Sequence, residues 1–157
     1  MDASAVHGNL RVRFGDAIAD YVEPQAGDPV IDVAAEAWHA VARHLRDDAA
    51  LRFDLLRMVS GVDFEDSLAS VYHLYSITHN HAVTIRVRLD REGPVVASVV
   101  DIWPAADWHE RESWDLLGIR YEGHPNLQRM FLPEDWPGHP LRKDYIAPEE
   151  YHGIPNN

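Results

Sequence analysis

An amphipathic helix is the clearest element that the pattern of apolar and polar residues predicts. Over residues 34–46 the apolar side chains recur at spacings of three and four, which places them in one stripe on a helix. The stripe consists of Ala34, Trp38, Val41, Ala42 and Leu45, and Glu36, His39 and Arg43 lie opposite. We expect this helix to pack on a sheet through its apolar stripe.

A β-hairpin is predicted over residues 68–89. In residues 81–89, apolar residues alternate with Thr84, Arg86 and Arg88, which is typical of a strand with one buried and one exposed face. A second apolar segment, residues 68–77, precedes it. Residues 78–80 between the two suit a tight turn, because Asn80 tolerates a positive φ. The two strands should therefore pair antiparallel.

Several further segments are apolar but less regular. We expect short strands over residues 17–22 and 29–33, separated by a turn at residues 24–28. We also expect a strand over residues 95–102 and a short helix over residues 10–14. Residues 53–62 are ambiguous between helix and strand, and the sequence favours a strand towards their end. Together these elements predict an α+β fold of two layers, with helices packed on a mixed or mostly antiparallel sheet.

A second helix is predicted over residues 105–117, with Gly118 at the place of a left-handed C-terminal stop. Its large apolar side chains point in several directions, because Trp108 lies about 120° around the helix from Trp114. Glu110 shares the side of Trp114 and Leu117, so its carboxylate must meet a cation or be neutral. The pattern indicates a helix held between the body and a neighbour. The alternative is that Trp108 merely covers a local loop.

The part of the chain after residue 117 is rich in proline. Six of the ten prolines lie there, and proline disrupts helix interiors and central strands. The segment nevertheless carries apolar anchors, namely Tyr121, Leu127, Met130, Phe131, Leu132, Trp136, Leu141, Tyr145 and Tyr151. We therefore divide the chain into an α+β body, residues 1–117, and an extended strap, residues 118–157, that docks on partner subunits. Arg142 and Lys143 form a small basic point that either meets an acidic neighbour or is solvated.

Composition narrows the possible functions. A chain of 157 residues suits one domain, and its net charge of −12 argues against nucleic acid as a partner. The absence of cysteine excludes disulfides, thiol nucleophiles and iron–sulfur clusters held by thiolates. No apolar run approaches the roughly 20 residues of a membrane span, and we expect no signal peptide. Association with a membrane should come only through a partner.

Candidate chemistry is weak throughout the chain. His73, His79 and His81 are close in sequence, but no nearby acid completes a metal site. Glu110 and Glu112 point about 160° apart on a helix, so they cannot flank one bond. No glycine-rich phosphate loop is present. We therefore expect no catalytic, cofactor-binding or metal-binding residue. A stand-alone hydrolase built around His109 and Glu110 is the least favoured alternative.

Specific residues also resemble a known family. The matching residues are Trp108, Glu110, Arg111, Glu112, Trp114, Asp115, Gly118, His124, Pro125, Arg129, Leu132, Pro133, Trp136, His139, Pro140, Arg142, Lys143 and Tyr145. Their order and spacing resemble the signature of the 30 kDa subunit of respiratory complex I, also called the C subunit of NADH-quinone oxidoreductase (NDH-1). Further matches lie upstream, so that the resemblance spans roughly residues 10–147. Leu117 departs from the Phe that the family often carries.

The resemblance implies an accessory subunit in the peripheral arm of a proton-translocating NADH-quinone oxidoreductase. It implies contacts with the D subunit, which carries the quinone site, and with the Fe–S-containing B and I subunits, on the cytoplasmic face of the bacterial cell membrane. The complex uses NADH, FMN, Fe–S clusters and quinone, whereas this chain should bind no cofactor and should show no activity alone. The alternative is the equivalent subunit of a related ferredoxin- or F420-dependent oxidoreductase or of a membrane-bound hydrogenase.

Overall fold

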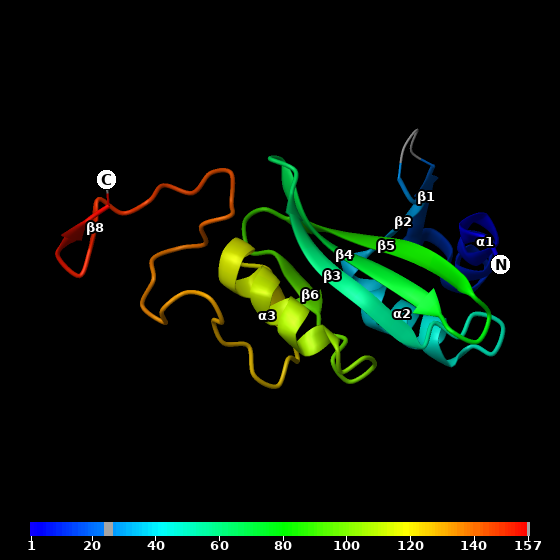
Figure 1. Ribbon diagram of the computed structural model, residues 1–157. Helices are drawn as coiled ribbons and strands as arrows, with labels where there is room; N and C mark the ends of the chain where they lie inside the picture. Colours follow the sequence, from blue (N-terminus) through cyan, green and yellow to red (C-terminus); the bar gives the residue numbers. More distant parts are fainter. Residues whose placement is uncertain (24–26, 157) are drawn as a thin grey trace.

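A five-stranded sheet with helices around it forms the body of the computed structural model, which describes residues 1–23 and 27–156 (Figure 1). The helices are α1 (Ala3–Phe14), α2 (Trp38–Asp47) and α3 (Ala106–Leu117), with short 3-10 turns at Gly15–Ala17 and Ala35–Ala37. The strands are β1 (Ile18–Val22), β2 (Val30–Val33), β3 (Leu55–Asp63), β4 (Ser67–Ser76), β5 (His81–Asp90), β6 (Val95–Ala97), β7 (Arg120–Glu122), β8 (Glu150–Tyr151) and β9 (Ile154–Pro155). The predicted α+β fold is confirmed.

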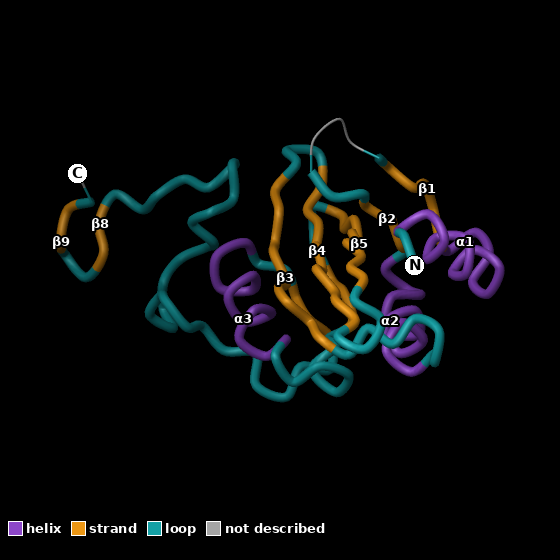
Figure 2. Tube along the Cα trace, turned by 45° about the vertical axis from the view of Figure 1, so that its right-hand side comes forward, coloured by secondary structure: helices purple, strands orange, loops and turns teal. Residues whose placement is uncertain are grey.

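The main sheet has the strand order β1-β2-β5-β4-β3. Only β2 and β5 pair in parallel; the other three neighbouring pairs are antiparallel. The predicted hairpin is confirmed as β4 and β5, which pair from Leu68 with Leu89 to Ser76 with His81. Asn80 in its turn has φ 51°, as its tolerance of positive φ indicated. Figure 2 shows α3 beside the edge strand β3, and α1 and α2 on the other side of the molecule.

The predicted amphipathic helix is confirmed as α2. Its stripe residues Trp38, Val41, Ala42 and Leu45 are completely buried in the core against the sheet. The ring of Trp38 lies 4.2 Å from that of Tyr72 on β4. Residues 35–37 form a 3-10 turn instead of the first helical turn, so the α-helix begins four residues later than predicted.

The other predicted elements of the body agree with the structure except for the first helix. That helix begins at Ala3 rather than at residue 10, because the Asp2 side chain accepts a hydrogen bond from the Ala5 amide and caps it. Most of the ambiguous residues 53–62 belong to the strand β3, as favoured. The short strands β1 and β2 lie where they were predicted, but residues 24–26 of the turn between them lie outside the described residues.

The prediction of a strand over residues 95–102 was wrong beyond Ala97. There the chain turns, because the amides of Ile102 and Trp103 donate to the Val99 carbonyl at 3.0 and 2.8 Å. The remaining strand β6 pairs in parallel with β7 in a separate two-stranded sheet. This pairing attaches residues 120–122 to the body, whereas the sequence analysis assigned them to the strap.

The strap leaves the body after β7 and follows an irregular path to the small β8–β9 hairpin (Figure 1). No residue from 122 to 156 is buried as a whole. Phe131 and Leu141 are 62% and 60% exposed, and Ile146 and Ile154 are 89% and 68% exposed. Among the residues that the structure describes, no helix has the length and apolar character needed to cross a membrane.

Candidate subunit interface

Asp115, near the end of α3, is the point at which the strap returns to the body. Its carboxylate is completely buried and accepts hydrogen bonds from the backbone amides of Met130, Phe131 and Leu132 at 2.9, 2.7 and 3.1 Å. The Arg129 guanidinium donates to the same carboxylate at 2.9 Å. Burial raises the pKa of Asp115, but the hydrogen bonds from Phe131, Arg129 and the other amides outweigh it and hold the pKa below its ordinary value.

Arg129 connects this carboxylate to the next turn of the strap. Its guanidinium also donates to the Asp115 carbonyl at 3.1 Å and to the carbonyls of Trp136 and Gly138, both at 2.9 Å. These bonds use the planar fork of donors that distinguishes arginine from lysine. We call Asp115, Arg129 and the amides of residues 130–132 the Asp115 anchor.

Gly118 allows the strap to pack closely over the end of α3. It adopts the predicted left-handed conformation, with φ 76° and ψ 17°. A Cβ atom at this position would lie 2.6 Å from Cδ2 of His139, which excludes other residues sterically. His139 in turn places Nδ1 2.9 Å from the Asp115 carbonyl oxygen, and its ring lies 5.2 Å from that of Trp114 at an angle of 58°. The helix stop and the strap contact therefore depend on the same glycine.

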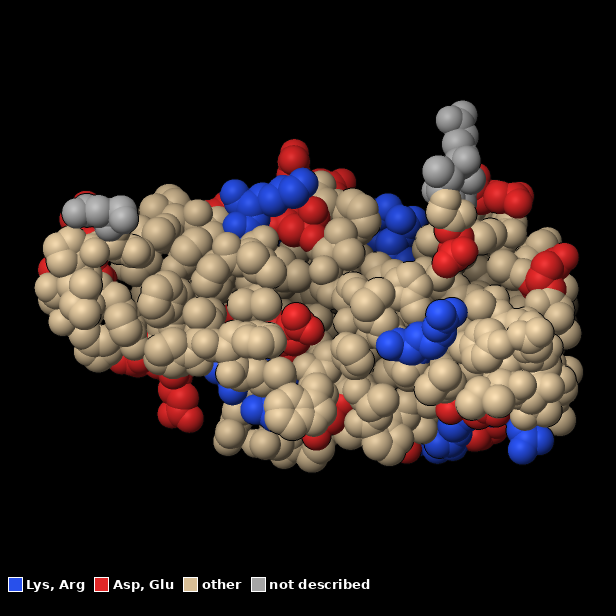
Figure 3. Space-filling model, in the orientation of Figure 1, with Lys and Arg blue, Asp and Glu red and all other residues tan. Residues whose placement is uncertain are grey.

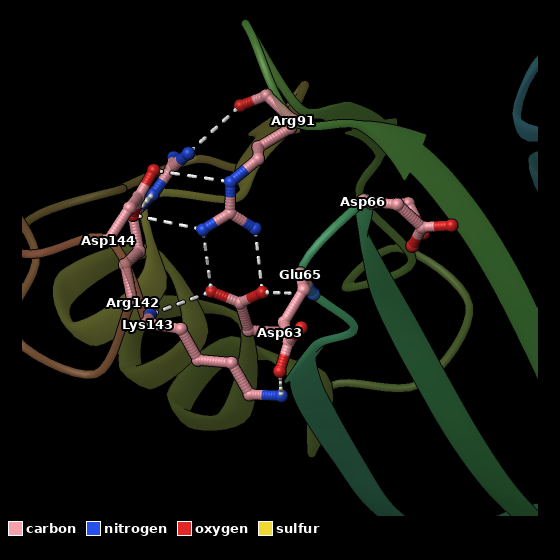
Figure 4. Close-up of polar contacts among 8 residues, drawn as sticks. Asp63, Glu65, Asp66, Arg91, Arg142, Lys143 and Asp144 are labelled. Atoms are coloured by element: carbon pink, nitrogen blue, oxygen red, sulfur yellow. Dashed lines mark hydrogen bonds and ion pairs between the residues drawn. The ribbon is translucent and has the colours of Figure 1, made fainter.

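A second contact, which we call the latch, joins the strap to two turns of the sheet (Figure 4). Arg91, just after β5, donates two hydrogen bonds to the carboxylate of Asp63 at the end of β3, at 2.6 and 3.0 Å. The strap adds Asp144, which accepts from Arg91 at 3.1 Å, and the Lys143 amide, which donates to Asp63 at 2.9 Å. The Arg142 guanidinium donates to the Arg91 carbonyl at 3.1 Å.

The latch is shielded from solvent at its centre. The side chains of Asp63 and Arg91 are only 4% and 18% exposed. The hydrogen bond from Arg91 is the largest influence on Asp63 and holds the pKa of that carboxyl well below its usual range. Arg91 and Asp63 were not singled out as site residues from the sequence, because only the pairing of β3, β4 and β5 brings the two strand ends together.

Arg91→Met should loosen the latch without detaching the Asp115 anchor. The substitution leaves the Asp63 carboxylate without its cation, so the free energy of unfolding at pH 7 should fall by more than it does on replacing an unpaired surface arginine. Because the pKa of Asp63 is lowered in the folded chain, this loss should be complete above its ordinary value of 3.8 and should shrink as the pH falls below it. Urea unfolding at several pH values measures both quantities.

Arg120→Met is the matched control for that experiment. Arg120 is exposed on β7 and forms no ion pair with the residues that the structure describes. Its replacement should change the free energy of unfolding by less than about 0.5 kcal/mol. An equal effect of the two substitutions would show that the latch contributes nothing beyond the loss of one positive charge.

The basic point predicted at Arg142 and Lys143 is used within the chain. Arg142 pairs with Asp144 at 3.1 Å, and the Lys143 ammonium pairs with Glu65 on the β3–β4 turn at 3.0 Å. The acidic partner of Lys143 therefore belongs to the body of the same chain, whereas that of Arg142 belongs to the strap itself. Both cations thus form ion pairs within the chain, although the side chain of Lys143 is still 53% exposed.

Glu110 holds the loop between β6 and α3. Its completely buried carboxylate accepts hydrogen bonds from the Ser98 hydroxyl at 2.6 Å and the Val99 amide at 2.9 Å. Among the described residues it pairs with no cation. Burial, with a smaller contribution from the negative charges of Asp107 and Asp101, raises the pKa of Glu110 to about 7, although the hydrogen bonds from Ser98 and Val99 lower it. The second of the two sequence alternatives, a carboxyl that tends to be neutral, therefore fits the structure.

The remaining signature residues divide between packed and exposed positions. Trp108 is 63% exposed, with the Arg111 guanidinium 5.2 Å from its ring centre. Arg111 also donates to two strap carbonyls, those of Gln128 and Arg129. Trp136 donates to the Tyr145 hydroxyl at 3.0 Å. The half-buried positions are His124, Leu132 and Pro140, and the exposed ones are Glu112, Pro125 and Pro133.

The signature thus concentrates on the contact between α3 and the strap. The Asp115 anchor and the latch hold the strap along the body from two directions, and they leave Phe131, Leu141 and Trp108 largely exposed. Burying such side chains against another protein is the main source of affinity at protein interfaces. This surface, Trp108 with the outward side chains of the strap, is the candidate interface.

Comparisons with known proteins identify a family and several sequence relatives that match most of this chain. Residues 31–151 match the family described as "Respiratory-chain NADH dehydrogenase, 30 Kd subunit". The C subunit of the NADH-quinone oxidoreductase from Chloroherpeton thalassium is 45% identical over 148 residues, which cover 92% of this chain and 61% of that protein. The C subunit from Chlorobium phaeobacteroides is 41% identical over 157 residues, covering 97% and 93%. The chain thus spans less than two thirds of the first relative and nearly all of the second.

Solved structures share the fold. The trypsin-resistant fragment of Nqo5 superposes with a TM-score of 0.69 at 26% identity, covering 81% of this chain and 100% of the fragment. A chain from the membrane-bound sulfane sulfur reductase, an archaeal respiratory membrane complex, superposes with a TM-score of 0.72 at 21% identity, covering 91% and 85%. The second likeness shows the fold alone. From the family match and the sequence relatives, the chain belongs to the respiratory-chain NADH dehydrogenase 30 kDa subunit family.

Proposed function

We propose that this chain is an accessory subunit that holds neighbouring subunits together in a proton-translocating NADH-quinone oxidoreductase. The observation that carries the proposal is a strap fixed to its own body at two places while large apolar side chains along it stay exposed. A segment ordered in advance loses less conformational entropy when it docks, so it binds more tightly for the same contact area. The family match supports the proposal that this docking takes place in an NADH-quinone oxidoreductase.

The partners we propose are the D subunit, which carries the quinone site, and the Fe–S-containing B and I subunits. The exposed Trp108 of α3 and the outward side chains of the strap contact them. The chain lies on the cytoplasmic face of the bacterial membrane and is attached only through these partners. Its own net charge of −12 supports this arrangement, because an anionic lipid surface would repel it.

The proposed role is structural rather than redox. The sequence contains no cysteine, so it offers no thiolate to an Fe–S cluster. Electrons pass from NADH through FMN and Fe–S centres to quinone in the other subunits, and the isolated chain has no activity. What the chain contributes is the relative position of its neighbours, since electron and proton transfer depend on fixed geometry.

A related assembly with a different electron donor is the second candidate. The fold likeness to a chain of an archaeal respiratory membrane complex favours it only at the level of architecture. Ferredoxin- or F420-dependent oxidoreductases and membrane-bound hydrogenases fall into this class. The electron donor that the purified assembly oxidises distinguishes the candidates: oxidation of NADH with reduction of quinone supports the first.

Purification of the tagged chain from gently solubilised membranes tests the proposal. We expect the quinone-site and Fe–S subunits to copurify with the wild-type chain, and Trp108→Ala to weaken this association by about 2 kcal/mol, or roughly 30-fold. The melting temperature of the isolated variant should stay within about 2 °C, because Trp108 is 63% exposed. A wild-type chain that purifies alone would refute the proposal. Equal losses of assembly and thermal stability would assign Trp108 to the internal core.

A further inference from the structure

The end of the strap forms a small unit of its own beyond the latch. The hairpin of β8 and β9 lies at the end of the molecule opposite α1 (Figures 1 and 2). Its Tyr151 ring lies 4.9 Å from Trp136, and the Tyr151 hydroxyl donates to Asp135 at 2.7 Å. His152 lies 2.8 Å from the other oxygen of Asp135. These contacts fix the hairpin against residues 135 and 136 and so define which side chains point outward.

The lysine and arginine residues of the strap all precede this hairpin in the sequence, and most of them form ion pairs within the chain. Arg129 belongs to the Asp115 anchor, and Arg142 and Lys143 belong to the latch. The remaining cation, Arg120, lies on β7 beside the body. Residues 144–157 contain no lysine or arginine. On the face seen in Figure 3, the outermost part of the strap accordingly shows acidic side chains and no basic one.

Three carboxylates and one isoleucine are exposed on this unit. Glu134, Glu149 and Glu150 form no ion pair or side-chain hydrogen bond with the residues that the structure describes. Ile154 on β9 is 68% exposed. We call these four residues the hairpin patch. Its apolar side chain favours burial, whereas its carboxylates tolerate burial only opposite cations.

We propose that the hairpin patch docks on a basic surface of a partner subunit, with Ile154 in an apolar pocket and the carboxylates facing lysine or arginine. The proposal rests on the scaffold function given above and specifies the chemistry of one docking site. An acidic partner is excluded by repulsion, since the strap keeps no outward cation at this end to offset it. A second copy of the chain would itself carry −12 and is disfavoured for the same reason.

Charge reversal on the patch tests this inference in the assembled complex. We expect Glu134→Lys, Glu149→Lys and Glu150→Lys together to weaken copurification of the partner subunits by about tenfold or more at low salt. The association of the wild-type chain should weaken as salt rises, whereas that of the triple variant should change little. The thermal unfolding of the isolated variant should match the wild type, because none of the three carboxylates forms an ion pair or side-chain hydrogen bond with the described residues.

A second triple variant controls for net charge. Glu36→Lys, Asp90→Lys and Glu92→Lys change the charge by the same amount at exposed positions of the body without ion pairs among the described residues. We expect this variant to assemble like the wild type. Equal weakening by both triples, or weakening by neither at any salt concentration, would overturn the docking site while leaving the scaffold function standing.

Two further results would also be decisive. A wild-type chain that copurifies with no partner would overturn the scaffold function and the docking site together. If the purified chain sediments as a dimer that the patch reversal dissolves, the occupant is a second copy, and the basic partner is ruled out.

Discussion

Asp115→Ala should release the strap from the end of α3. The substitution leaves the Arg129 guanidinium and the amides of Met130, Phe131 and Leu132 without their shared acceptor. Losing one partner of a buried charged pair costs about 3–5 kcal/mol, so we expect a fall of about that size in the free energy of unfolding. The amides of residues 130–132 should exchange with solvent at least about 100-fold faster, because the opening of the strap no longer breaks these bonds.

Asp115→Asn is the matched variant for the charge. Its amide group keeps a carbonyl oxygen that accepts from the strap amides, but it loses the attraction to Arg129, so its effect should be smaller than that of alanine. Hydrogen exchange followed by mass spectrometry measures both variants, with the β4–β5 hairpin as an internal reference. Unchanged protection of residues 130–132 in Asp115→Ala would mean that other contacts hold the strap.

Glu110→Gln should stabilise the protein at alkaline pH. Burial raises the pKa of Glu110 to about 7 from an ordinary value of 4.5, so the folded chain holds this proton more strongly than the unfolded chain does. Wild-type stability should therefore fall as the pH rises from about 4.5 to 7, and the full loss, about 3 kcal/mol, should be present above pH 7. Glutamine imitates the protonated side chain and carries no such loss.

The charged groups around Glu110 act in the same direction as burial, whereas the hydrogen bonds from Ser98 and Val99 oppose it. Asp101 and Asp107 add negative charge, and the buried hydroxyls of Tyr72 and Tyr121 supply no positive charge. The expected result is a Gln variant equal to the wild type near pH 4.5 and about 3 kcal/mol more stable at pH 8, measured by urea unfolding across that range. Glu112→Gln on the exposed side of α3 is the control and should change neither quantity. A variant less stable than the wild type at pH 8 would mean that the carboxylate is compensated in the fold.

Regular periodicity within one element made much of the fold predictable. The stripe of α2 and the alternation in β5 each repeat over several turns or residues, so local sequence determines which face is buried. The strand predicted beyond Ala97 failed for a reason that lies outside its own sequence. The Val99 amide bonds to the carboxylate of Glu110 on α3, which bends a β-branched segment into a turn.

The candidate interface was predictable only in part. The several directions of the apolar side chains on α3 and the stop at Gly118 were visible in the sequence, and the structure confirms the stop and the exposure of Trp108. Arg142 and Lys143 were visible as a basic point, but their partners were not. Asp63 and Glu65 lie about 80 residues earlier in the chain, at separations of 80 and 78 from Lys143.

The sequence by itself determined the class of the protein: an α+β body, a proline-rich strap, no thiolate ligands and a family signature centred on α3. Only the tertiary structure decided which charges of the strap pair within the chain and which stay exposed. The period of a helix or strand shows which residues share one face of that single element. An ion pair such as that of Asp63 with Arg91 forms only when the ends of two strands lie side by side. That meeting depends on the order of strands in the sheet, which no local pattern contains.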